Sequence, residues 1–232
     1  MSQEHRIPRP LAVVTGASRG IGRAIALRLA YNFDILALAR SKNDLDSLAD
    51  EVRARGTACR VVAVDLRDVE AVTRALQGVD AEVLVNNAGI GPMKPFLELS
   101  ADEWSAMVDV NFNALFHVTR ALLPGMAKRG RGHIVVIGSI TGRSASIGGT
   151  CYAATKHAAQ AFVECLNLEV RDRGVKVSIV NPGAVATSFS QRADDSWMLS
   201  PEEVAESVAH VIETPPDVLV HSLEIRALTP KK

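Results

Sequence analysis

Two side chains that could transfer a proton, Tyr152 and Lys156, lie four positions apart within residues 150–157. Four residues are a little over one helical turn, so in a helix both side chains would leave the same face. An ammonium group close by is expected to lower a tyrosine pKa of about 10 by roughly 1–3 units. The pair is therefore a candidate proton donor, although the same spacing also occurs in ordinary amphipathic helices.

A glycine-rich turn near the N-terminus offers a second kind of chemistry, the binding of phosphate. Gly16, Gly20 and Gly22 lie between an apolar run at residues 11–15 and a helical pattern at residues 23–30. Glycines let the backbone approach a ligand closely, and the N-terminus of the following helix favours an anion. The spacing is not the common G-x-G-x-x-G fingerprint. A tight turn without a ligand is the alternative, but three glycines favour the phosphate interpretation.

The end of the second apolar run, residues 33–39, bears on the choice between the two nicotinamide cofactors. An NAD site usually has a carboxylate there for the ribose hydroxyls, whereas this chain has Arg40. A guanidinium group could pair with the 2′-phosphate of NADP(H), and Arg19 could flank that phosphate. The sequence therefore predicts NADP(H), the alternative being that both arginines are solvated surface residues.

The elements that must position these residues are strands and helices in alternation. Apolar, partly β-branched runs predict seven strands at residues 11–15, 33–39, 60–64, 82–85, 133–138, 175–180 and 218–228. Helical periodicity lies between them, in particular at residues 69–77, 104–128, 152–171 and 201–212. This alternation predicts an α/β fold with a parallel sheet and helices on both faces. Because no linker interrupts the series, we expect a single domain over residues 1–232, with residues 1–9 as an N-terminal tail.

Composition excludes several classes of partner. Lys plus Arg equals Asp plus Glu at 26 each, so no net charge favours nucleic acid or an anionic membrane. No apolar run reaches the roughly 18–20 residues of a membrane helix, and no signal peptide precedes the first strand. Cys59, Cys151 and Cys165 are odd in number and lack metal-type spacing. We therefore expect a cytoplasmic protein with reduced cysteines and no metal.

Several motifs in a fixed order resemble the short-chain dehydrogenase/reductase superfamily, over about residues 11–187. They are residues 15–22 (Thr-Gly-Ala-Ser-Arg-Gly-Ile-Gly), residues 86–89 (Asn-Asn-Ala-Gly), Asn111, Ser139, Tyr152 and Lys156. Ser139 precedes Tyr152 by the thirteen positions that are usual in that family. The resemblance implies a Rossmann-type, doubly wound sheet of about seven strands in an NADP(H)-preferring oxidoreductase.

The resemblance also implies roles for individual residues. Tyr152 would act as general acid and base, and Lys156 would lower the tyrosine pKa and hydrogen-bond the nicotinamide ribose. Ser139 would hold the substrate oxygen, and Asn111 would support a water path; taken singly, these two would more often be structural. The implied cofactor-binding residues are Gly16, Ser18, Arg19, Ile21 and Arg40 at the adenosine phosphates, Asp65, Leu66, Asn87, Ala88 and Gly89 around the adenine and its ribose, Tyr152 and Lys156, and Pro182, Gly183, Val185 and Thr187 at the nicotinamide end.

The expected reaction is hydride transfer between NADP(H) and a small-molecule carbonyl or alcohol, as in a ketone or aldehyde reductase. Three alternatives stay open: an NAD-dependent alcohol or hydroxy-acid dehydrogenase, a 3-oxoacyl thioester reductase, and a non-catalytic dinucleotide-binding regulatory protein. The C-terminal segment 223–230 lacks the Gly-Gly of many relatives, which favours small-molecule carbonyl reductases and hydroxy-acid dehydrogenases.

Two further expectations concern the substrate and the assembly. Residues 188–200 are expected to form a lid over the substrate, with Phe189, Trp197 and Met198 as its apolar underside. The helical patterns at residues 104–128 and 152–171 would, by resemblance, pack against a second subunit. We therefore expect a homodimer or homotetramer.

Overall fold

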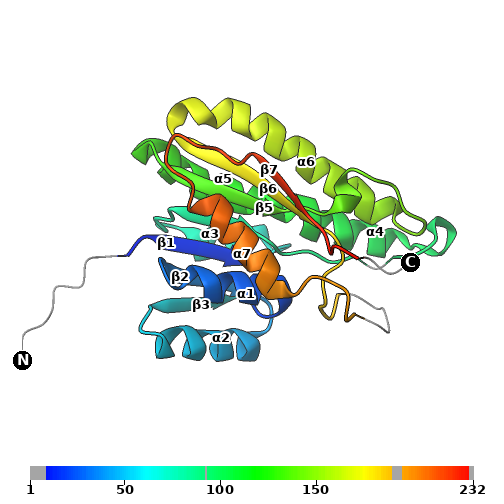
Figure 1. Cartoon of the computed structure of the whole chain (residues 1–232), viewed down its shortest axis with the longest axis horizontal. Coiled ribbons are helices and arrows are strands. Elements are labelled where there is room, and N and C mark those ends of the chain that lie inside the picture. The colour runs from blue at the N-terminus through cyan, green and yellow to red at the C-terminus, as the bar shows by residue number, and fades with distance from the viewer. Residues whose placement is uncertain (1–8, 92, 190–194, 230–232) are drawn as a thin grey trace, which may run out of the picture.

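Seven parallel strands form one sheet in the computed structural model, which describes residues 9–91, 93–189 and 195–229 (Figure 1). The strand order is β3-β2-β1-β4-β5-β6-β7. The strands are β1 (Leu11–Thr15), β2 (Asp34–Ala39), β3 (Cys59–Ala63), β4 (Val83–Asn86), β5 (Gly132–Ile137), β6 (Val175–Pro182) and β7 (Ser222–Ile225). The predicted doubly wound parallel sheet is confirmed.

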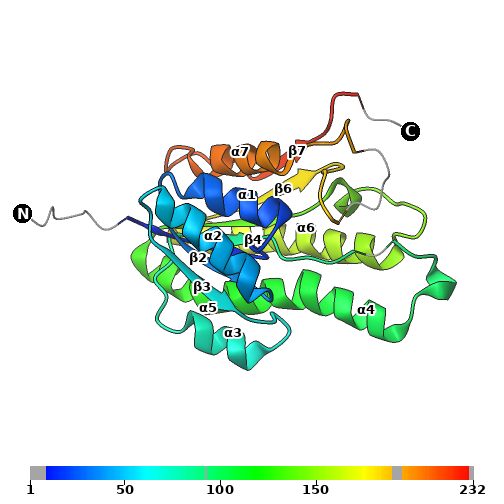
Figure 2. The same ribbon diagram turned by 90° about the horizontal axis from the view of Figure 1, so that it is seen from below.

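Helices cover both faces of the sheet and bury a separate apolar core on each (Figure 2). One layer consists of α1 (Gly20–Leu29), α2 (Lys42–Ala54) and α7 (Pro201–Ile212). The other consists of α3 (Val69–Leu76), α5 (Ala114–Arg129) and α6 (Thr150–Val170), with α4 (Ala101–Val108) continuing the line of α5. In the part of the chain that the structure describes, no helix is long and apolar enough to span a membrane.

Polar side chains begin several helices where the sequence places them. Ser100 and Ser200 each accept a hydrogen bond from the backbone N–H three residues later, and the serine N–H in turn donates to the carboxylate of the glutamate there. These capping boxes satisfy N–H groups that the first helical turn leaves without partners. Pro201 follows the second box at the first helical position, where a missing N–H costs nothing.

The long helical pattern predicted at residues 104–128 is helical throughout, but a π-helical turn at Asp109–Asn113 separates α4 from α5. The sequence did not predict this turn, where Asn111 points inward and hydrogen-bonds the backbone of Ile90, an interaction that no local pattern reveals. Pro124 lies inside α5 without ending it.

The last strand is shorter than the predicted residues 218–228. β7 lies at the sheet edge and pairs only with β6, over four residues. Residues before it form a turn instead, in which the Val218 N–H donates to Pro215 O and Lys176 Nζ donates to Val218 O. The strand ends at Ile225, and Leu228 beyond it is 97% exposed.

The chain runs outward from β1 to β3 and then returns to the other side of β1 at β4. Such a reversal of strand order leaves a crevice at the carboxyl ends of the strands, where ligands bind in open α/β sheets. The glycine turn follows β1, and residues 87–89 follow β4. The fold thus brings both motifs to the crevice.

Candidate active site

A cavity of about 810 Å³ opens along the carboxyl ends of the strands. Every predicted cofactor-binding residue lines it, together with Ser139, Tyr152 and Lys156, whereas Asn111 does not. Residues that the sequence did not single out also line it, among them Ser41 and Asp44. Residues separated by up to 173 positions in the chain, from Gly16 to Phe189, therefore face one space.

The glycine turn at one end of this cavity is closely packed against β4. Gly16 has a φ of +65°, which favours glycine, and a Cβ atom on Gly22 would overlap the Gly16 carbonyl oxygen. The Asn87 side-chain amide donates to Thr15 O at 3.0 Å, and the backbone N–H groups of Asn87 and Ala88 donate to Thr15 Oγ1 at 3.0 and 3.1 Å. These bonds fix the turn against the strand that carries residues 87–89.

The N-terminus of α1 is open toward this end of the cavity. Arg19 occupies the N-cap, and among the described residues its side chain makes no capping hydrogen bond. No acidic residue occupies the first turn of α1. The helix dipole and the N–H groups of the first turn therefore favour an anionic ligand.

Arg40 lies on the cavity wall after β2, as the sequence predicts, and is exposed. Within the described ranges it forms no ion pair closer than 4 Å. The neighbouring Asp65 is instead held by Arg67 at 2.6 Å, and this hydrogen bond, with a smaller contribution from Arg40, lowers the Asp65 pKa. Ser41, at the N-cap of α2, makes no side-chain capping bond among these residues and lines the same space. A serine preceding a helical pattern was a signal that could have identified it.

At the other end of the cavity, α6 presents Tyr152 and Lys156 on one face. Lys156 Nζ lies 5.7 Å from the centre of the Tyr152 ring and donates to Ile137 O at 2.9 Å. Lys156 is buried, and burial lowers the pKa of its ammonium group to about 8. The predicted juxtaposition of the phenol and the amine is present.

The predicted direction of the Tyr152 pKa shift is wrong in this structure. Burial raises the pKa of the phenol above 10, and hydrogen bonding with the Ser139 hydroxyl offsets this only in part. Lys156 does not offset this desolvation, because its own pKa is lowered to about 8 and the amine is uncharged at the pH where the phenol ionises. The tyrosine is consequently protonated at neutral pH.

Ser139 and Asn111 support this end of the site in different ways. Ser139 caps a 3₁₀ turn at Ile140–Gly142, and its Oγ accepts a hydrogen bond from the Thr141 N–H at 3.1 Å. Asn111 is buried behind the cavity wall, where its side chain bonds both the N–H and the carbonyl of Ile90 at 2.8 Å. It also donates to Thr155 Oγ1 at 3.1 Å. The predicted water path through Asn111 stays a prediction.

Phe189 lies beside the tyrosine where a substrate would approach. The two ring centres are 5.8 Å apart. A Cβ atom on Gly91 would overlap the Phe189 ring and would come within 2.7 Å of Tyr152 Cδ2, so this position accepts only glycine without rearrangement. Of the predicted lid, residues 190–194 lie outside the described residues. The remainder returns through a bridge between Val185 and Leu199 and buries Met198.

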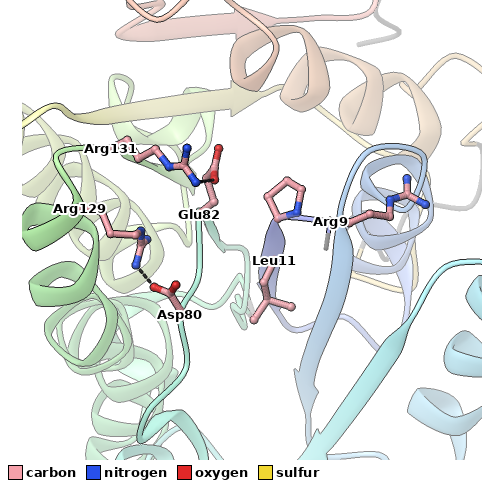
Figure 3. Close-up of a pocket in the computed structure, with 7 residues that line it drawn as sticks. Arg9, Leu11, Asp80, Glu82, Arg129 and Arg131 are labelled. Carbon is pink, nitrogen blue, oxygen red and sulfur yellow. Dashed lines mark hydrogen bonds and ion pairs between the residues drawn. The ribbon is translucent and has the colours of Figure 1, made fainter. Parts of the chain in front are cut away.

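A second hollow, of about 420 Å³, lies at the amino ends of the strands, beside the starts of β1, β4 and β5 (Figure 3). Arg129 pairs with Asp80 and Arg131 with Glu82, while Arg9 donates to Thr57 Oγ1. The charges around it thus already have partners within the chain. The described residues contain no group of three or more His, Cys, Asp or Glu side chains that could bind a metal.

Comparison with known proteins relates the whole arrangement to one group of enzymes. A family model described as short chain dehydrogenase matches residues 10–197. The NADP-dependent 3-hydroxy acid dehydrogenase YdfG of Salmonella typhi is 33% identical, over 94% of this chain and 95% of that protein.

Solved structures agree in fold over nearly the full length. The closed form of serine dehydrogenase complexed with NADP⁺ has a TM-score of 0.88 at 31% identity, covering 96% of each chain. An alcohol dehydrogenase from the archaeon Thermococcus sibiricus, complexed with 5-hydroxy-NADP, has a TM-score of 0.88 at 32% identity, covering 96% of this chain and 99% of that one.

Proposed function

Because this chain belongs to the short-chain dehydrogenase family, we propose that it is an NADP(H)-dependent oxidoreductase that interconverts a ketone or aldehyde and the corresponding alcohol. One observation carries the proposal. A single cavity joins an anion-favouring helix N-terminus and Arg40 at one end to Tyr152, Lys156 and Ser139 at the other. A phosphate-bearing hydride carrier would therefore reach a group able to exchange a proton.

The residues around the cavity fit NADP(H). The closely packed glycine turn and the open N-terminus of α1 suit a pyrophosphate, because a side chain on Gly22 would occupy space that the turn needs. Arg40 and Arg19 are positioned along the wall to pair with the 2′-phosphate, and Ser41 could add a hydroxyl donor. Relatives with solved structures bind NADP⁺ and 5-hydroxy-NADP, which supports the same choice here.

In the proposed reaction, a hydride would be exchanged between NADP(H), when bound, and the carbonyl carbon of the substrate. Tyr152 gives its phenolic proton to the carbonyl oxygen in reduction and takes it back in oxidation. The Ser139 hydroxyl holds that oxygen by a hydrogen bond. Burial raises the pKa of the phenol further above neutrality, so Tyr152 carries the proton that reduction requires.

An NADPH-oxidation screen over ketones, dicarbonyls, 3-oxoacyl thioesters and quinones, with NADH as the control cofactor, tests the proposal. Tyr152→Phe keeps the ring but removes the proton, so turnover should fall by about 10²–10⁴-fold. Near-wild-type turnover of this variant would exclude the acid role. Arg40→Ala should lose the preference for NADPH over NADH, and an unchanged preference would contradict the assignment of Arg40.

The names of relatives favour a second candidate substrate. The 3-hydroxy acid dehydrogenase and the serine dehydrogenase both act on hydroxylated acids. We therefore add 3-hydroxy acids and serine, assayed as NADP⁺ reduction, to the screen. Faster turnover of these than of neutral ketones would identify a hydroxy-acid dehydrogenase.

Three broader expectations belong to the same proposal. Residues 188–200 act as a lid, with Phe189 against Tyr152 as its inner contact. A Trp197→Ala variant with unchanged Michaelis constants across ketones would argue against that lid. The enzyme works as a homodimer or homotetramer in the cytoplasm.

A further inference from the structure

A chain of polar side chains runs behind the active site, from the surface of α6 to the backbone of Ser139. Glu164 Oε1 accepts a hydrogen bond from Gln160 Nε2 at 2.8 Å. Gln160 Oε1 accepts one from Asn181 Nδ2 at 3.3 Å, and Asn181 Oδ1 accepts one from the Ser139 N–H at 3.1 Å. Gln160 is 9% and Asn181 1% exposed, so both amides lie in the interior.

The contact between Asn181 and Ser139 depends on the absence of a side chain at Gly138. A Cβ atom at Gly138 would overlap Asn181 Oδ1 and would come within 2.9 Å of Ile179 Cδ1. Because Gly138 has no side chain, the Asn181 amide has room to accept the hydrogen bond from the N–H of Ser139. Both ends of this amide are satisfied, as burial of a polar group requires.

α6 holds the end of β5 at two points. Tyr152, Lys156, Gln160 and Glu164 follow one another at intervals of four residues, so neighbours in this series are close on successive turns of the helix. Lys156 bonds Ile137 O directly, and Gln160 reaches Ser139 through Asn181. These two bonds hold the short segment from Ile137 to Ser139. Ser139 carries the hydroxyl that interacts with the Tyr152 phenol.

We propose that Gln160 is a positioning residue of the active site, which acts through Asn181 to fix Ser139 against Tyr152. This inference rests on the proposed role of Tyr152 as the proton donor. Gln160 touches neither Tyr152 nor the cavity, so its effect passes through the two hydrogen bonds of Asn181. A methionine at position 160 would fill similar volume but would leave Asn181 Nδ2 without its acceptor, and the amide would lose its fixed orientation.

The experiment uses the two tyrosines of the chain. Tyr31 is 65% exposed, and Tyr31→Phe leaves Tyr152 as the one tyrosine, whose ionisation is followed by tyrosinate absorbance. Rapid pH jumps to about pH 12 record the spectrum before the protein unfolds. In this background we compare Gln160→Met, Ser139→Ala and the double variant. Fluorescence titration with NADPH verifies that each variant is folded.

The charged groups around the phenol stay the same in all these variants. Lys156 Nζ lies 5.7 Å from the Tyr152 ring centre. The other charged side chains that line the cavity belong to its adenosine end: Arg19, Arg40, Asp44 and Asp65. Because Ser139 lowers the Tyr152 pKa, loosening it should raise that pKa.

Gln160→Met should raise the titration midpoint of Tyr152 by up to the shift of Ser139→Ala, about 0.5–1 pKa unit. The double variant should shift no further than Ser139→Ala, because both substitutions act through one hydrogen bond. Val163→Ala, a buried truncation on the same helix, is the control and should lower stability without moving the midpoint.

An unshifted midpoint in Gln160→Met, or shifts that add in the double variant, would overturn the inference. A shift of the same size in Val163→Ala would show a general loosening of α6 and would overturn it as well. The titration needs no substrate. Its outcome is therefore separate from the Tyr152→Phe turnover assay, which tests the proposed function itself.

Discussion

Burial of Lys156 makes its charge dependent on pH within the working range of an enzyme. The pKa of the ammonium group is lowered to about 8, so the amine loses its proton at a pH where an exposed lysine keeps it. The family resemblance implies that this group would donate to the nicotinamide ribose. A neutral amine is a weaker donor, and cofactor affinity should follow the protonation of this one side chain.

We predict that NADPH binding weakens as pH rises through about 8. If binding requires the charged amine, the dissociation constant should increase by up to about tenfold between roughly pH 7.5 and 9. Fluorescence titration at constant ionic strength measures it. Lys156→Met should bind more weakly but with little dependence on pH over the same range. Parallel pH dependence in the two proteins would rule out Lys156 as the titrating group.

For single residues, the sequence could predict which side chains come together in the site but not how their pKa values shift. Tyr152 and Lys156 share a helix, and the glycine turn and Arg40 each follow a strand, so local spacing and topology suffice to place them on one cavity. The raised Tyr152 pKa depends on burial beneath Phe189 and Gly91, which come from distant segments. Side-chain burial is a property of the assembled fold, so the spacing of residues in the sequence does not predict it.

Among the elements, the turn between β1 and α1 is tightly packed. A Cβ atom on Gly22 would overlap both the Gly16 carbonyl oxygen and the Asn87 amide, and these two are hydrogen-bonded to each other. Neither neighbour can move without disturbing the contact between β1 and β4. By contrast, a Cβ atom on Gly125 in α5 would meet only the end of the Arg129 side chain, at 3.4 Å.

The same substitution should therefore have opposite effects at the two glycines. Gly22→Ala should lower the free energy of unfolding by about 1–3 kcal/mol through overpacking, and should weaken NADPH binding. Gly125→Ala should raise the free energy of unfolding by about 0.5–1 kcal/mol, because alanine favours the helix. Urea denaturation measures both. Equal effects at the two positions would show that the packing around Gly22 relaxes at little cost.

The strands β5 and β6 contain a buried histidine that should limit stability in acid. His133 Nε2 lies 2.8 Å from Ser178 Oγ, and burial, with a smaller effect of Lys176, lowers the imidazole pKa to about 3. Between that value and the ordinary 6.5, the unfolded chain binds a proton that the folded chain does not. The free energy of unfolding therefore falls as pH drops from 6.5 toward 3.

Replacing the pair by His133→Val with Ser178→Ala should remove this acid sensitivity. When the pH is lowered from about 7.5 to 5, the free energy of unfolding of the wild-type protein should fall by about 2 kcal/mol. The double variant should not show this loss. Urea denaturation at both pH values measures the difference, and Ser178→Ala alone is the control that retains the histidine. Equal losses in the wild type and the double variant would contradict the assignment.

Elements were predictable where local signals define them and not where tertiary contacts override them. The capping boxes at Ser100 and Ser200 lie in the sequence itself, and the helices begin there. The π-turn at Asp109–Asn113 exists because Asn111 reaches Ile90, twenty-one residues earlier. The short β7 reflects its place at the sheet edge, with one neighbour instead of two. Both features depend on which segments become neighbours.

Across the whole molecule, the layer of α1 and α7 is joined by charge as well as by apolar packing. Arg28 pairs with Glu206 at 2.9 Å and with Glu213 at 3.0 Å, and its guanidinium lies over the Tyr31 ring. α1 begins at the glycine turn, and α7 follows the predicted lid. The cofactor end and the substrate end of the site therefore rest on one connected layer.

The opposite layer leaves apolar side chains in solvent and should carry the subunit contact. Phe116 on α5 is 49% exposed and Leu168 on α6 is 61% exposed. Burying them against a second copy removes apolar surface from water, and a symmetric pair of such faces would form a closed dimer.

We predict that light scattering during gel filtration gives two or four times the chain mass of 24.8 kDa. Phe116→Glu with Leu168→Glu should yield monomers, because the interface would then desolvate charges. Val69→Glu, on the exposed surface of α3, is the matched control and should leave the mass unchanged. A wild-type monomer would refute the prediction outright.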